Sequence, residues 1–90
     1  MATHIDLSEQ LDPTARRFGE RLKTHRLKAG LTQGQLAEKT RTTGSYISSI
    51  ERGRANPTLD LMVKLAEQVG TEAWDMIRPE QSTSDLEQSQ

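Results

Sequence analysis

The stretch that decides the fold is LTQGQLAEKTRTTGSYISSIERG, residues 31–53. Its second half has the pattern of a short helix, because Ile47 and Ile50 recur three residues apart and Gly53 ends the run. Ser and Gly are poorer helix formers than the Glu, Lys or Gln that a solvated helix face normally carries. The face opposite the two isoleucines nevertheless consists of Gly44, Ser45, Ser48 and Ser49. Small groups of this kind suit a helix that another surface approaches closely.

Capping residues and periodic apolar positions predict four further helices around this one. Thr32, Thr43 and Thr58 each stand where an N-cap is needed, and Gly30 and Gly70 stand where a helix would end. No segment shows a strand pattern. The expected helices cover residues 14–29, with Pro13 at the start, then 33–39, 44–52, 59–69 and 72–77. The sequence therefore predicts an all-α fold of five short helices.

The composition limits the chain to one small domain. Only 32% of its 90 residues are hydrophobic, and a core of this size often depends on a partner subunit. There is no cysteine, which excludes a disulfide framework and a thiolate metal site. No apolar run reaches the length of a signal or membrane segment, so we expect a cytoplasmic protein. We expect an N-terminal arm over residues 1–12, a folded domain over 13–78 and a disordered polar tail over 79–90.

The charges are unevenly distributed. Residues 13–58 hold ten Lys and Arg against three acids, whereas residues 59–90 hold two against seven. A basic middle between acidic flanks indicates a polyanionic partner, although a solvated basic face is the simpler alternative. Two short helices joined by a tight turn lie within this basic middle. That is the helix-turn-helix pattern, in which the second helix enters the DNA major groove and hydroxyls contact base edges or phosphates.

From about Phe18 to Ile77 the sequence resembles the Cro and phage-repressor (XRE-type) helix-turn-helix domain. The matching motifs are Leu31-Thr32-Gln33, Leu36-Ala37, Tyr46-Ile47-Ser48, Ile50-Glu51-Arg52-Gly53 and Pro57-Thr58-Leu59. The resemblance implies a compact lambda-repressor-like fold. It also implies a regulator that binds double-stranded DNA, either a repressor or a dual activator and repressor.

The resemblance further implies roles for individual residues. Gln33 would bind a phosphate or reach the edge of the site. Arg26 and Glu51 would form a partly buried ion pair between the first and third helices. The positions that usually read bases or flanking phosphates are Thr43, Gly44, Ser45 and Ser49, with Ser48 on the same hydroxyl-rich face. The positions that usually grip the DNA backbone are Arg52, Arg54 and Asn56.

Three positions depart from the family pattern. Arg41 occupies the turn position where the family usually has Gly, and a non-Gly residue tolerates positive φ poorly. We therefore expect the turn to take a different path and to direct Arg41 towards DNA. His25 stands where the family commonly has Leu, and we expect a half-buried structural residue. Gly44 lacks a side chain that could specify a base, so readout there would use the backbone or DNA shape.

The sequence also predicts a homodimer. One short recognition helix touches only a few base pairs, and each Ser or Thr discriminates modestly, so two modules must act together. The expected contact lies on the last short helix at Trp74, Met76 and Ile77, with Ile5 and Leu7 of the arm as further candidates. The operator is then expected to be an inverted repeat.

Other classes of function have less support in the sequence. Acidic residues and histidines do not cluster at catalytic spacing and there is no Gly-rich phosphate loop, so we expect no enzyme activity, cofactor or metal. The alternative is an antitoxin or a bridging protein whose main ligand is another protein. Such a protein would need a partner-binding segment in residues 1–12 or 78–90.

Overall fold

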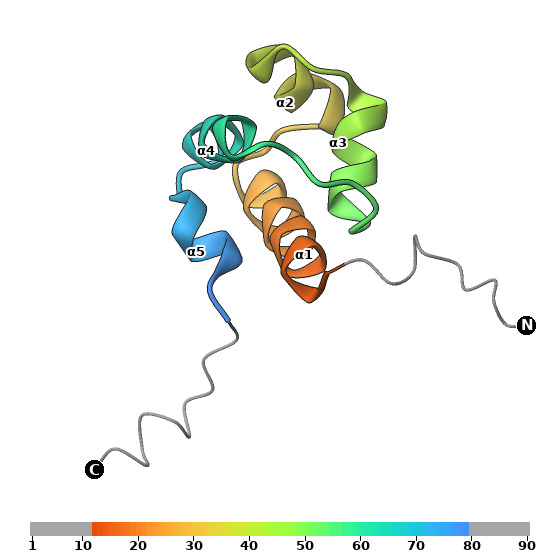
Figure 1. Cartoon of the computed structure of the whole chain (residues 1–90). Helices are drawn as coiled ribbons and strands as arrows, with labels where there is room; N and C mark the ends of the chain where they lie inside the picture. The colour runs from red at the N-terminus through yellow and green to blue at the C-terminus, as the bar shows by residue number, and fades with distance from the viewer. Residues whose placement is uncertain (1–11, 80–90) are drawn as a thin grey trace, which may run out of the picture.

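A computed structural model describes residues 12–79, which form five helices (Figure 1). These are α1 (Pro13–Lys28), α2 (Gln33–Thr40), α3 (Gly44–Glu51), α4 (Leu59–Gln68) and α5 (Ala73–Ile77). The predicted all-α fold is confirmed, and each predicted range differs by no more than one residue at either end. The arm up to Leu11, with Ile5 and Leu7, and the tail from Glu80 lie outside the described residues.

Short polar side chains begin four of the helices. Thr32, Thr43 and Thr58 each accept a hydrogen bond from a backbone N–H in the first turn of α2, α3 and α4, as predicted. Asp12, which we had assigned to the arm, caps α1 by accepting from the backbone N–H of Thr14 at 2.7 Å. The N-cap of α1 is therefore the last residue of the expected arm.

All five helices contribute to one core. In Figure 1, α1 runs through the middle, with α3 on one side, α4 and α5 on the other, and α2 above it. Gly19 lets α1 pass close to the end of α3, since a Cβ atom at this position would overlap the carbonyl oxygen of Ile50. The largest fully buried side chains are Phe18, Leu22, Leu36, Ile47, Ile50, Leu65 and Met76. The burial of Met76 contradicts its predicted place in a dimer contact. The other side of the short helix faces outward, so Trp74 is exposed as expected and Ile77 is half-buried.

Two arginines of α1 hold α5 in place. Arg21 donates from Nη1 to the carbonyl oxygens of Asp75 and Arg78, at 3.0 and 2.8 Å, and Arg17 donates to that of Ile77 at 3.3 Å. These carbonyls lie at the end of α5, where a helix leaves backbone acceptors without intrahelical partners. Arg17 and Arg21, which belong to the basic stretch, therefore stabilise the fold through these hydrogen bonds.

The turn between α2 and α3 differs from our expectation. Arg41 is the one non-Gly residue with positive φ among the described residues, at φ 61° and ψ 42°. The Thr42 N–H donates to the carbonyl oxygen of Ala37 at 2.9 Å, and the Arg41 N–H donates to that of Glu38 at 3.4 Å. This is the closure that glycine usually allows at a helix end. The expected different path was wrong: the turn keeps the left-handed conformation and Arg41 adopts it.

Candidate nucleic-acid interface

The first turn of α2 lies against α3. The two helices approach each other through a pair of glycines, since a Cβ built on Gly44 would lie 3.6 Å from the Cα of Gly34. That distance is an ordinary van der Waals contact. The Thr43 hydroxyl accepts from the backbone N–H of Tyr46 at 3.1 Å, so α3 begins with a capped first turn. The capped first turn of α3 therefore lies in van der Waals contact with the first turn of α2.

The outer face of α3 carries the small residues that the sequence singled out. Ile47 and Ile50 are fully buried, and helical spacing places the residues between them on the opposite side. Thr43 and Ser45 are exposed, while Gly44, Ser48 and Ser49 are half-buried. Gly44, Ser45, Ser48 and Ser49 thus lie on one side of α3, which offers hydroxyls and backbone, and Thr43 stands at its N-cap.

The end of α3 presents two exposed arginines. The Arg54 N–H donates to the carbonyl oxygen of Ser49, and the Gly53 N–H donates to that of Ile50, both at 2.9 Å. These two bonds form a Schellman motif with Gly53 at φ 74°. Arg52 and Arg54 flank this glycine and are exposed, and Asn56 is exposed in the loop that follows. Arg41 is exposed at the other end of the unit, in the turn that precedes α3.

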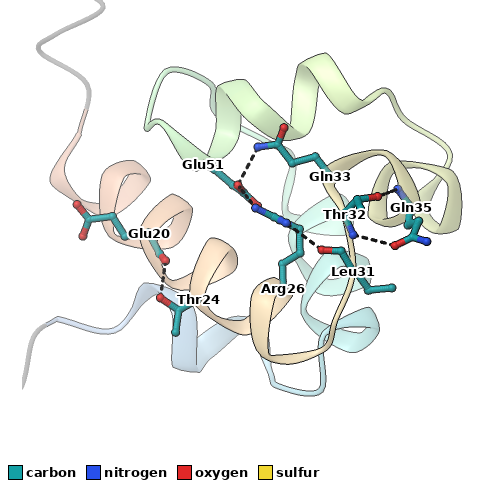
Figure 2. A network of polar contacts seen from close by, with 8 residues as sticks. All are labelled: Glu20, Thr24, Arg26, Leu31, Thr32, Gln33, Gln35 and Glu51. Carbon is teal, nitrogen blue, oxygen red and sulfur yellow. Dashed lines mark hydrogen bonds and ion pairs between the residues drawn. The ribbon is translucent and has the colours of Figure 1, made fainter.

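A buried ion pair joins α1 to the end of α3 (Figure 2). Arg26 Nε donates to Glu51 Oε2 at 2.6 Å and Arg26 Nη2 donates to Glu51 Oε1 at 3.0 Å, which is a bidentate arrangement. The two side chains are 8% and 2% exposed. Arg26 Nη1 also donates to the carbonyl oxygen of Leu31 at 2.8 Å. The predicted ion pair is present, and it also anchors the connection between α1 and α2.

Gln33 is the third side chain in this network. Its Nε2 donates to Glu51 Oε1 at 3.0 Å, a contact that the sequence does not predict (Figure 2). Gln33 and Glu51 are 18 residues apart, so only the packing of α2 on α3 brings them together. No buried side-chain polar atom in residues 12–79 lacks a hydrogen-bond partner.

His25, on α1, is half-buried as expected.

The predicted dimer residues lie apart from this surface. Trp74 and Ile77 belong to α5, which packs on α1 and α4. Two further exposed apolar residues, Leu59 and Val63, lie on α4 and were not among the predicted dimer residues. They stand four residues apart and therefore share one face of that helix.

Two capped helices, a tight turn and an outward second helix define a helix-turn-helix unit. A family model described as helix-turn-helix matches residues 22–73. The chain therefore belongs to the XRE-type helix-turn-helix family of DNA-binding transcription regulators. No helix within residues 12–79 is long and apolar enough to cross a membrane.

Individual relatives agree with this assignment. The immunity repressor protein of Bacillus phage phi105 is 44% identical over 52 residues, which cover 58% of this chain and 36% of the repressor. The control protein C.BamHI of Bacillus amyloliquefaciens is 34% identical over 61 residues, covering 67% of this chain and 75% of its own. The restriction-modification controller protein C.AhdI of Aeromonas hydrophila superposes with a TM-score of 0.64 and is 34% identical, covering 69% of this chain and 94% of its own. This chain thus spans only about a third of the phage repressor's length.

Proposed function

We propose that this protein is a sequence-specific transcriptional regulator that binds double-stranded DNA as a homodimer on an inverted-repeat operator. The observation that carries the proposal is the outer face of α3, where Thr43, Ser45 and Ser49 are flanked by exposed arginines. Hydroxyls can contact base edges, and the arginines can contact phosphates on both sides of the groove. The chain's relatives include a phage immunity repressor, a control protein and a restriction-modification controller protein, which supports a regulator that works on DNA in the cytoplasm.

The exposed apolar residues of α4 and α5 support the homodimer. Trp74 is 60% exposed, although tryptophan is highly buried on average, and Leu59 is 68% exposed. Met62 of α4 and Ile77 of α5 line the same cavity of about 140 Å³, so the two helices adjoin there. We propose that the subunit contact is formed by Trp74, Ile77, Leu59 and Val63, with Met76 excluded by its burial. A two-fold dimer places its recognition helices about 34 Å apart, which requires half-site centres about 10–11 base pairs apart.

The DNA-binding proposal is tested by selecting a duplex from random DNA and titrating it at several salt concentrations. Arg52→Ala and Arg54→Ala should each weaken binding to selected and random duplexes alike. Each should also reduce the slope of log affinity against log salt by about 1, because one phosphate contact is lost. Ser45→Ala should instead leave that slope unchanged and relax base preference within the half-site. If the affinity of the parent protein for the duplex does not change with salt concentration, the proposal is refuted.

The dimer proposal is tested by sedimentation of Trp74→Ala. The variant should lower the dimer fraction and weaken operator binding, while its far-ultraviolet circular dichroism stays that of the parent. Leu27→Ala is the matched control, because Leu27 is similarly exposed, at 59%, but lies at the end of α1. A parent protein that is monomeric at micromolar concentration and selects a site without two-fold symmetry would rule the homodimer out.

A further inference from the structure

We propose that Glu51 is a positioning residue for DNA binding, which turns the Gln33 amide so that its nitrogen donates to a DNA phosphate. The inference rests on the proposed DNA-binding function and assigns a second task to the buried ion pair. Glu51 itself is 2% exposed at its side chain and cannot reach DNA. Its effect on binding therefore has to pass through a neighbour, and Gln33 is the neighbour that joins it to the start of α2.

The carboxylate of Glu51 decides which end of the Gln33 amide faces it. An ionised carboxylate only accepts hydrogen bonds, so it attracts the NH₂ group and repels the amide oxygen. Both Glu51 oxygens already accept from Arg26, and Oε1 accepts from Gln33 Nε2 as well, at 3.0 Å. The two hydrogen bonds from Arg26 fix the position of the Glu51 carboxylate. Gln33 is thereby held with its nitrogen at the junction between α2 and α3.

The second N–H of Gln33 Nε2 is the one that would donate a hydrogen bond to a DNA phosphate oxygen. An amide nitrogen carries two hydrogens, and the bond to Glu51 uses one of them. Gln33 is half-buried and is the first residue of α2, directly after the N-cap Thr32. A helix start favours an anion, and a phosphate oxygen needs only one donor. Without Glu51, the amide could turn and present its oxygen, which would repel the phosphate.

The packing of α1 on α3 does not require the Gln33 side chain. Arg26 holds Glu51 through two hydrogen bonds and reaches the Leu31 carbonyl with a third, and none of these involves Gln33. Removing the amide should thus leave the packing of α1 on α3 intact. This separation makes a double-mutant cycle informative, because it measures whether Glu51 acts on DNA through Gln33 or independently of it.

The experiment titrates the selected operator duplex with the full chain as parent, Gln33→Ala, Glu51→Gln and the double variant, well below their melting temperatures. Gln33→Ala should weaken binding about tenfold, the loss of one hydrogen bond to a charged group. Gln33→Glu should weaken it further, because a second carboxylate would face both Glu51 and the phosphate. Glu51→Gln should weaken binding in the parent and have no further effect once Gln33 is alanine. Gln68→Ala, an exposed glutamine on α4, is the control that should bind like the parent.

The outcomes separate this inference from the proposed function. If Glu51→Gln weakens binding by the same factor with and without Gln33, or if Gln33→Ala binds like the parent while Arg52→Ala does not, the positioning role is wrong and DNA binding stands. If the parent binds no duplex, the proposed function itself fails.

A second measurement needs no variant at Glu51. In the parent protein, the two Gln33 side-chain N–H resonances should be separate and slow to exchange with water. Addition of operator duplex should shift one of them and leave the other in place. A rapidly exchanging amide with no response to DNA would overturn the inference.

Discussion

The arginines of α1 and the arginines around α3 belong to the same basic stretch of sequence, yet they differ in their contacts and exposure. Arg17, Arg21 and Arg26 donate to backbone carbonyls or to a buried carboxylate. Arg41, Arg52 and Arg54 are exposed at the two ends of α3. The comparison shows that charge counted along a sequence overstates what a polyanion can reach. Three of the ten basic residues in residues 13–58 contribute to the structure of the domain.

Among the variants that test this comparison, we expect the largest loss of stability at the buried ion pair of Arg26 and Glu51. Arg26→Ala should lower the free energy of unfolding by roughly 3–5 kcal/mol, because it leaves the Glu51 carboxylate buried without its charged partner. Urea denaturation followed by circular dichroism measures the loss. Replacing both partners with apolar residues, Arg26→Met with Glu51→Leu, should recover much of it. An Arg26→Ala protein as stable as the parent would contradict the structural role of the pair.

A smaller effect is expected at the contact between α1 and α5. Arg21→Ala should lower the free energy of unfolding by about 1–3 kcal/mol, since a charged donor to two carbonyls is lost. It should also reduce the dimer fraction, because α5 carries Trp74. Lys23→Ala, at an exposed position on the same helix, should change stability by less than about 0.5 kcal/mol. Equal losses for the two variants would mean that Arg21 does not anchor α5.

Local features of the structure could be predicted from the sequence. Three Thr N-caps, the glycine stops and the spacing of Ile47 and Ile50 depend only on neighbouring residues, and the structure has them all. The face of α5 could not be predicted in this way. A helix of five residues has too few turns for periodicity to show which side is buried, so Met76 was placed outward although it is in the core.

Features that depend on distant packing were also missed. Arg21 and the Arg78 carbonyl are 57 residues apart, and nothing local in α1 distinguishes Arg21 from a solvated arginine. The Gln33 bond to Glu51 crosses from the start of α2 to the end of α3. The sequence resemblance identified both residues, but assigned them to separate roles. Only the packing of α2 on α3 shows that they meet.

The smallest expected effect is at Arg41, where stability and DNA binding should change in opposite directions. A non-Gly residue in the left-handed conformation costs roughly 1–2 kcal/mol, and part of this is offset because Gly is more flexible in the unfolded chain. Arg41→Gly should therefore raise the free energy of unfolding by about 0.5–1 kcal/mol. The same change removes an exposed positive charge beside α3, so it should weaken operator binding and flatten its salt dependence.

Arg41→Lys separates the two effects, because it keeps the charge and the strained backbone. This variant should match the parent in both urea denaturation and salt-dependent DNA titration. Arg41→Asn should resemble Arg41→Gly in DNA binding, since Asn is uncharged, and should retain part of the stability gain because Asn tolerates positive φ. If Arg41→Gly lowers stability, the left-handed turn is not strained by arginine. If it leaves DNA binding unchanged, Arg41 belongs with the arginines of α1 and not with Arg52 and Arg54.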